Sequence, residues 1–266
     1  VLGCLPSSAR AADGRVPVYQ LPVTLDQAGS YYLTRDLSDA GGSPSVLIAA
    51  DDVTLDLAGH TLERTDGSGD VIGVEGARTN IVIRNGRILG GARGLQLINF
   101  GGSSFRVRLE DLIVADATDV GMYIEGGSEV LVPSNVVIRD VVVADTGSDG
   151  IHLRSIEGGG VYESQVRNAG RDGILLNNTD SLTVSRSNVS RNARHGIRTL
   201  NARFCVVRDN QASYNGEYGI LFESVDQDDD IAWKDNTMYG NGLGSWGAVD
   251  SSGYGIMHLD GNYPDN

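Results

Sequence analysis

The sequence predicts an all-β fold, a solenoid in which short strands wind in one direction and stack coil upon coil. Three observations predict it. A Gly-aliphatic-x-apolar motif recurs seven times. A second series of short, β-branched segments lies between these copies, and no segment has a helical hydrophobic period long enough for the crossover helix of a βαβ unit. Such strands bury their apolar faces only by stacking on neighbouring coils, about 4.8 Å apart.

The composition excludes several other classes of protein. Hydrophobic residues make up 40% of the 266 residues and charged residues 21%, which supplies a core and argues against a disordered chain. The 36 glycines follow no Gly-x-y period, so collagen is excluded. A formal charge of −14 is opposite to that of a duplex nucleic-acid binder, so no nucleic-acid partner is expected. No apolar run approaches about 18 residues, so we expect no membrane span.

The first 17 residues are expected to be the remnant of an export signal or a flexible tail. The run Ala9-Arg10-Ala11 has the small-x-small pattern that ends a secretory signal. The run Val1-Leu2-Gly3-Cys4 resembles a bacterial lipoprotein box, which would lipidate Cys4. We therefore expect an exported protein, located in the periplasm, outside the cell or on the outer surface as a lipoprotein. Residues 18–45 are predicted to form an N-terminal cap.

The repeat predicts that the coils occupy residues 46–266. Copies of the motif begin at Gly94, Gly121, Gly150, Gly173, Gly196, Gly219 and Gly255. Successive copies are 27, 29, 23, 23, 23 and 36 residues apart. A period in the twenties built from short strands indicates a solenoid, here of about nine coils. The longer steps predict loops near residues 99–105, 126–135 and 240–252.

The type of solenoid follows by elimination. Leucine-rich repeats need a regular Leu-x-x-Leu-x-Leu spacing and hexapeptide β-helices need a strict period of six, and neither pattern occurs here. A single right-handed parallel β-helix remains. Asn168, Asn192 and Asn215 precede the next repeat glycine by four or five residues. This spacing favours a ladder of stacked asparagines over asparagines that merely occupy turns.

The opening of the chain and its Gly-Ile-x-Leu repeats resemble exported bacterial right-handed β-helix proteins of the pectate-lyase-like superfamily. The resemblance lies in the segments Leu25–Leu37 and Asp52–Leu62 together with the repeats, and it covers about residues 18–260. That superfamily includes pectate lyases, mannuronan C5-epimerases, polygalacturonases, phage tailspikes and periplasmic accessory proteins. The resemblance implies an exported carbohydrate-active protein with a saccharide groove at the middle of one solenoid face, and it does not name the reaction.

Strand alternation predicts which side chains point outward together. The x positions of the motif form one outward column: Gly73, Gln96, Tyr123, His152, Leu175, Arg198, Leu221 and Met257. Two residues further on, a second column contains Ile98, Glu125, Arg154, Asn177, Leu200 and Glu223. The positions before the glycines give a third: Arg93, Val120, Asp149, Asp172, His195, Tyr218 and Tyr254. Polar residues are concentrated in the middle coils.

Five residues of these middle coils are candidates for catalysis: Tyr123, Asp149, His152, Arg154 and Arg198. Removal of the C5 proton of a uronate needs a base, an acid and a cation beside the substrate carboxylate. His152 fits the base, Tyr123 is able to donate or accept a proton, and Arg154 or Arg198 fits the cation. Asp149, three residues before His152, is expected to orient its ring. This set predicts β-elimination or C5 epimerisation.

The same patch supplies candidate substrate-binding residues: Glu125, Asp172, Asn177, His195 and Tyr218. Asp149 and Asp172 are one coil apart, so their carboxylates would lie about 5 Å from each other, the separation in a retaining glycosidase. The alternative is that both are solvated turn residues. The acidic run 226–230 would offer oxygen ligands to Ca²⁺ or would simply be a solvated loop; no other cofactor or metal is expected.

We expect a monomeric, exported protein whose central face acts on an acidic polysaccharide, as a uronate lyase or a C5-epimerase. The alternative is a non-catalytic periplasmic or surface β-helix that binds glycan or protein. The segment Ser148–His152 contains the Asp and the His of the Asp-Pro-His signature of mannuronan epimerases, without its proline or its spacing. The paired aspartates and Gly-His-Gly of polygalacturonases are absent. A trimeric tailspike would need a long apolar outer stripe, which the columns lack.

Overall fold

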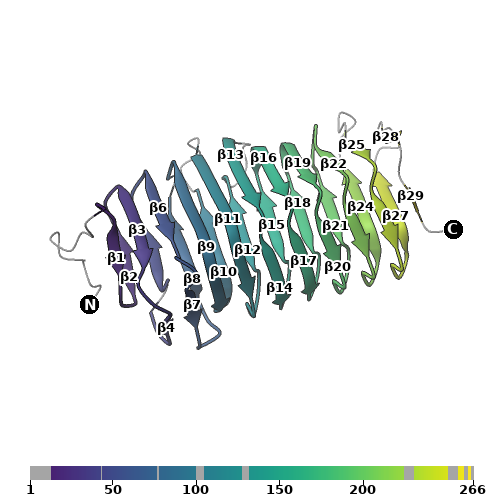
Figure 1. The fold of residues 1–266 in the computed structure, drawn as a ribbon. Coiled ribbons are helices and arrows are strands. Elements are labelled where there is room, and N and C mark those ends of the chain that lie inside the picture. The colour runs from purple at the N-terminus through teal and green to yellow at the C-terminus, as the bar shows by residue number, and fades with distance from the viewer. Residues whose placement is uncertain are drawn as a thin grey trace.

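The computed structural model describes residues 13–42, 44–76, 78–99, 105–127, 132–224, 231–250, 257–260 and 263–264. These residues form the all-β parallel solenoid that the sequence predicts, with about nine turns along one axis (Figure 1). β1 lies at one end of the stack and β29 at the other. No helix in these ranges is long and apolar enough to cross a membrane.

The ten-stranded sheet, called sheet A here, takes one strand from each coil, and each strand pairs in parallel with the strand of the next coil. Its strands are β2 (Val23–Leu25), β5 (Val46–Ile48), β8 (Asp70–Glu75), β10 (Arg93–Ile98), β12 (Met122–Glu125), β15 (Ile151–Arg154), β18 (Ile174–Asn177), β21 (Ile197–Leu200), β24 (Tyr218–Ser224) and β27 (Gly244–Asp250).

The other sheet, sheet B, wraps the remaining sides of the coils and has nineteen strands. They are β1 (Val16–Val18), β3 (Gly29–Leu33), β4 (Leu37–Asp39), β6 (Val53–Asp56), β7 (Thr61–Arg64), β9 (Ile81–Gly90), β11 (Phe105–Ala115), β13 (Val132–Arg139), β14 (Val142–Thr146), β16 (Ile156–Tyr162), β17 (Gln165–Ala169), β19 (Asp180–Ser185), β20 (Asn188–Ser190), β22 (Val206–Arg208), β23 (Gln211–Ser213), β25 (Ile231–Lys234), β26 (Thr237–Tyr239), β28 (Met257–Asp260) and β29 (Tyr263–Pro264).

The repeat glycines are explained by close packing between coils. A Cβ added to Gly150 would lie 2.4 Å from Cγ1 of Val166 and 2.7 Å from the carbonyl oxygen of Gly173. A Cβ on Gly173 would likewise lie 2.4 Å from Cγ1 of Val189. These approaches are too short for any side chain, which explains why a glycine lies at or next to the first residue of β10, β12, β15, β18, β21 and β24.

One corner of sheet B turns through a residue in the left-handed conformation in coil after coil. The positive φ values are found at Asn85, Asp111, Asp140, Glu163, Arg186, Asp209 and Asp235. A Cβ disfavours this conformation, and Asn and Asp tolerate it best because their short polar side chains hydrogen-bond locally. At Asp140 the corner ends β13 and directs the chain into β14.

Buried Val, Ile and Leu side chains from both sheets fill the interior along its length, and an asparagine ladder lines one turn. Asn192 Nδ2 donates to Asn215 Oδ1 at 2.9 Å, and Asn215 Nδ2 donates to Asn241 Oδ1 at 3.0 Å. The prediction for Asn168 is wrong by one residue. Its exposed side chain donates to Asp145 Oδ1 instead, and the backbone N–H of Ala169 donates to Asn192 Oδ1.

The last coil differs from the prediction. Met257, placed in the outward column by its motif, lies in β28 and pairs with Ile231 of sheet B. The tenth strand of sheet A is β27, within the range 240–252 that was predicted to be a loop, and Gly247 there pairs with Leu221. The range 126–135, also predicted to be a loop, contains the start of β13.

Several other expectations concern the ends of the chain and the acidic run. Residues 18–45, the expected cap, contain β2, β3 and β4, which pair in parallel with β5, β6 and β7; their role as a cap stays a prediction. Cys4, Tyr254 and residues 226–230 lie outside the described ranges. Within those ranges, no group of three or more His, Cys, Asp or Glu side chains could hold a metal ion.

Candidate functional site

Apart from Met257, which lies in β28, the outer face of sheet A carries the first two predicted columns in the predicted register. Tyr123 pairs with His152, and Glu125 pairs with Arg154. Leu175 follows His152 and separates it from Arg198. The candidate residues therefore divide into two clusters. The first lies on or just before β12 and β15 and consists of Tyr123, Glu125, Asp149, His152 and Arg154. The second lies on or just before β18, β21 and β24 and consists of Asp172, Asn177, His195, Arg198 and Tyr218.

The first cluster is built around a contact between an aspartate and a histidine. Nδ1 of His152 lies 3.2 Å from Oδ2 of Asp149, whose side chain is 2% exposed. Burial alone would raise the pKa of Asp149, but the hydrogen bond and charge of His152 and the backbone N–H of Asp172 hold it below its ordinary value. Whenever the imidazole is neutral, an ionised Asp149 favours the tautomer with the proton on Nδ1, which leaves the lone pair on Nε2.

Nε2 of His152 is buried, and it has no hydrogen-bond partner among the described residues. The ring of Tyr123 meets the His152 ring edge-on, with 5.1 Å between centroids. On the other side is Leu175, which is only 4% exposed although it points outward. An unpaired acceptor in surroundings of low polarity is a costly arrangement, and the lone pair of Nε2 is not committed to any proton donor among the described residues.

Tyr123 is linked to two charged residues of the second column. Its hydroxyl donates to Oε2 of Glu125 at 2.7 Å. Burial, and then this hydrogen bond, raise the pKa of Tyr123 above its ordinary value, so the phenol keeps its proton. Arg154 lies 3.7 Å from Oε1 of Glu125, and its contact with the Tyr123 hydroxyl raises its own pKa. The Arg154 side chain is 42% exposed and is able to meet a ligand.

Arg198, the other candidate cation, is already paired. Its Nε donates to Glu223 Oε2 at 2.6 Å, and its Nη1 donates to Asp172 Oδ2 at 3.3 Å. Burial alone would lower the pKa of Arg198, and these two carboxylates raise it. With 13% of its side chain exposed, Arg198 holds the second cluster together rather than facing an open surface.

His195 belongs to the same second cluster and is held as a neutral imidazole. Its Nδ1 accepts the backbone N–H of Tyr218 at 3.3 Å, and its Nε2 lies 3.1 Å from Oε2 of Glu217. The proton of the neutral ring is therefore on Nε2. Burial lowers the pKa of His195, and the charges of Asp172 and Glu217 oppose this only in part.

The other predicted binding residues differ in accessibility. Asn177 and Tyr218 are half-buried, and the ring of Tyr218 stacks on that of His195 at 5.8 Å. Asp172 is fully buried. Glu217 was not among the candidates, although it directly precedes Tyr218. A second group, in which Arg93 Nε donates to Asp70 at 2.7 Å, was also missed, although Arg93 lies in the third column.

Taken together, the first cluster holds an acceptor at His152, a protonated phenol at Tyr123 and an accessible cation at Arg154. These are the groups that an acid–base reaction beside a carboxylate needs. The second cluster is a network of ion pairs and hydrogen bonds whose members already satisfy one another.

Comparisons with known proteins agree with the architecture. The periplasmic alginate epimerase AlgG, in a double-mutant form, superposes with a TM-score of 0.63 at 12% identity, over 94% of this chain and 73% of that one. The A-module of mannuronan C-5 epimerase AlgE4 from Azotobacter vinelandii gives 0.60 at 16% identity, over 95% and 88%. The enzymatically active domain of bacteriophage CBA120 tailspike protein 2 gives 0.61 at 14% identity, over 93% and 40%. At such identities the likeness concerns the fold.

No curated protein matches the chain. The family model described as "Right handed beta helix region" matches residues 93–263. Because that match spans more than half of the sequence and agrees with the parallel coils of the structure, the protein belongs to the right-handed β-helix family.

Proposed function

We propose that the outer face of sheet A over β12 and β15 is the active site of a lyase that cleaves an acidic polysaccharide by β-elimination. The observation that carries the proposal is the Asp149–His152 contact with an unpaired Nε2. The likeness to two epimerases and a tailspike domain, whose names refer to alginate, mannuronan or an enzymatically active domain, supports a polysaccharide as the substrate class.

In the proposed reaction, a neighbouring side chain moves aside, and the exposed Nε2 of His152 takes the C5 proton of a uronate residue. The electron pair of the C–H bond moves toward the C6 carboxylate, and Arg154 stabilises the charge that develops there. The pair then forms the C4–C5 double bond as the bond from C4 to the glycosidic oxygen breaks. The hydroxyl of Tyr123 gives its proton to the departing oxygen, and Glu125 holds that hydroxyl in place.

The geometry favours elimination over epimerisation. Epimerisation needs an acid and a base on opposite faces of C5, with the sugar between them. The rings of Tyr123 and His152 are in contact at 5.1 Å, so no sugar ring fits between them. Both groups therefore reach the same face of a sugar that lies on sheet A. Chains of mannuronate or glucuronate carry the C5 hydrogen and the C4 oxygen on one face, so these are the expected substrates.

The test uses four polymers, of mannuronate, glucuronate, guluronate and galacturonate. The expected result is new ultraviolet absorbance from unsaturated ends with the first two and little with the others. NMR in D₂O reports C5 inversion separately, and inversion without unsaturated ends would overturn elimination in favour of epimerisation. His152→Gln removes the base, and Arg167→Gln is the matched control, since Arg167 is exposed and pairs with Asp145 on sheet B.

A second candidate function is glycan binding without catalysis. The observation that favours it is the burial of Nε2 beneath its neighbours, because a substrate reaches that atom only if a neighbouring side chain moves. Under this alternative, His152→Gln would leave polysaccharide binding unchanged and no polymer would yield unsaturated ends. Binding of mannuronate or glucuronate oligomers together with an absence of products would therefore replace the lyase proposal.

A further inference from the structure

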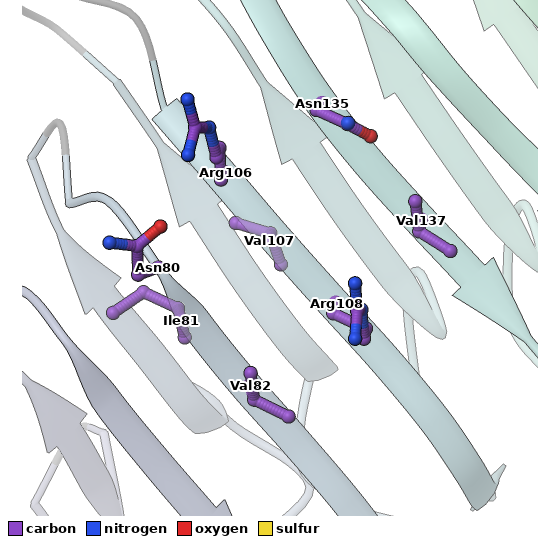
Figure 2. A pocket seen from close by; sticks show the side chains of 8 residues that line it. All are labelled: Asn80, Ile81, Val82, Arg106, Val107, Arg108, Asn135 and Val137. Carbon is purple, nitrogen blue, oxygen red and sulfur yellow. The ribbon is translucent and has the colours of Figure 1, made fainter. Parts of the chain in front are cut away.

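We propose that sheet B carries a second binding surface, which takes a carboxylate-bearing segment of an acidic saccharide at a hollow over β9, β11 and β13. The hollow has a volume of about 280 Å³. Figure 2 shows the side chains of Arg106 and Arg108, on β11, between residues of the two neighbouring strands. Its polar and apolar lining comes from Asn80, Val82, Arg106, Arg108, Asn135 and Val137.

The register arranges these residues in rows across the three strands. Val82, Arg108 and Val137 form one row, so a guanidinium stands between two apolar side chains. In the next row Arg106 pairs with Asn135, and Asn80 directly precedes β9 on the other side. Each arginine is thus flanked by groups that suit one part of a sugar acid. The valines fit its C–H surface and the amide of Asn135 fits its hydroxyls, while the guanidiniums fit its carboxylate. The amide nitrogen of Asn80 already donates to Oδ1 of Asp52 at 2.6 Å.

The charges of this surface are opposite to the charge of the whole chain. A third row holds Arg84, Glu110 and Arg139. The three rows therefore carry four arginines and one glutamate, on a protein whose formal charge is −14. This local excess makes the surface complementary to an anion that the rest of the molecule repels.

The arginines at the hollow are accessible and weakly engaged. Arg106 is exposed and makes no ion pair or side-chain hydrogen bond with a described residue. Arg108 is 58% exposed, and Nε lies 3.4 Å from Oε1 of Glu110, which leaves its terminal nitrogens available. By contrast, Arg84 already contacts Asp56 at 3.2 Å, and the guanidinium of Arg139 lies over the ring of Tyr162. Arg106 and Arg108 are therefore the residues that would hold the ligand.

That the ligand is a uronate, and not another carboxylate, rests on the function proposed for sheet A. The presence of the hollow and its arginines does not depend on that function. The hollow lies on the other sheet, so one polysaccharide chain would meet the solenoid at two separate surfaces. Binding on sheet B would keep a long substrate attached while the site on sheet A acts, because a second contact raises the effective concentration of the chain.

The test measures binding of mannuronate and glucuronate oligomers by calorimetry in the His152→Gln background, where no turnover occurs. The double variant Arg106→Gln, Arg108→Gln is expected to weaken the remaining affinity about ten-fold or more. The matched control is Arg167→Gln, Arg186→Gln, which removes the same charge from exposed arginines elsewhere on sheet B, and it is expected to change affinity little.

Several outcomes would overturn the proposal. Equal losses in the double variant and the control would show that net charge alone governs binding. Equal binding of a neutral glucan would remove the carboxylate as the recognised group, and equal binding of polyglutamate or a DNA oligonucleotide would replace a saccharide site with general polyanion binding. Unsaturated ends produced by the otherwise unmodified Arg106→Gln, Arg108→Gln protein would show that the proposed chemistry stands independently of this surface.

Discussion

Oδ1 of Asp149 accepts a hydrogen bond from the backbone N–H of Asp172, one coil further on, at 3.2 Å. The same bond recurs one coil later, where Asp172 Oδ1 accepts the N–H of His195, and again where His195 Nδ1 accepts the N–H of Tyr218. Each side chain thus receives the N–H of the following member of its column. Both aspartates are buried and neither is a solvated turn residue. Their carboxylates serve a ladder between coils, which replaces the retaining-glycosidase interpretation.

Asp149→Asn is expected to lower catalysis while the fold remains intact. The amide oxygen of Asn still accepts the N–H of Asp172, so the ladder is kept, but the negative charge that fixes the His152 tautomer is lost. The substitution is expected to remove part of the contribution of His152, because a positioned acid or base typically supplies a factor of about 10² to 10⁴ in rate. Initial rates on mannuronate or glucuronate polymers check this, with urea unfolding as the control for stability. An unchanged rate would remove Asp149 from the mechanism.

The depressed pKa of Asp149 also predicts that the protein loses stability in acid. Because the pKa of Asp149 is depressed in the folded state, its carboxylate stabilises the fold at pH values above the ordinary aspartate pKa of about 3.9. This stabilisation is lost as the pH falls below that value. The Asp149→Asn protein should therefore lose less stability than the parent between pH 5 and pH 3, two values chosen as roughly bracketing that range. Urea midpoints measured at both values report the difference. Parallel losses in the two proteins would mean that other carboxylates govern acid unfolding.

Arg154→Ala is expected to lower the reaction rate, whereas Arg198→Ala is expected to lower the stability of the fold. Arg154 is 42% exposed, so its loss should leave stability nearly unchanged and reduce the rate. Loss of Arg198 leaves the fully buried Asp172 without its cation, and breaking a buried pair costs about 3–5 kcal/mol. Thermal unfolding and initial rates measured on the same samples separate the two effects. A destabilised Arg154→Ala protein, or a stable Arg198→Ala protein, would contradict this division.

The depressed pKa of His195 predicts a second pH dependence of stability, at pH values closer to neutral. Its folded-state pKa is depressed, so the unfolded chain binds the proton more tightly and stability falls as the pH drops below the ordinary histidine value of about 6.5. Protonation of Nδ1 would also turn the acceptor for the Tyr218 N–H into a donor. His195→Asn offers an oxygen at this ladder position, as Asp149 and Asp172 do. The variant should lose less stability between about pH 7 and pH 5 than the parent, as followed by urea unfolding.

The periodicity of the sequence predicted the fold because each coil obeys the same steric demand. The repeat glycine, the inward aliphatics and the left-handed corner all arise from contacts with the neighbouring coil. The prediction for the final coil is wrong because it follows the motif copy at Gly255, whereas the asparagine spacing indicates an earlier return to sheet A. The step from Asn215 to Asn241 is 26 residues, and the same step from Gly219 reaches Ser245, which lies in β27. The ladder was the better guide to where the chain returns to sheet A.

The candidate site was predicted less completely, for a physical reason. Alternation identifies which side chains point away from the core but does not tell whether neighbours cover them. Leu175 and Arg198 both point outward, yet they are 4% and 13% exposed. Pairings such as Arg198 with Glu223 depend on rotamers that span neighbouring coils, and no sequence period encodes them. The Asp149–His152 contact was predictable because three residues along one chain segment place both groups at the same edge.

Gly173→Ala is expected to destabilise the protein by about 1–3 kcal/mol, the usual cost of overpacking. The new methyl would lie 2.4 Å from Cγ1 of Val189 and 2.7 Å from the carbonyl oxygen of Gly196, and the backbone oxygen cannot rotate away. Gly41→Ala is the matched control, because nothing lies within 4 Å of its added Cβ. Thermal unfolding of the two variants should therefore diverge by several degrees, with only the first shifted downward. Equal stability of both would mean that the coils separate easily at the start of sheet A, and the explanation offered for the repeat glycine would be lost.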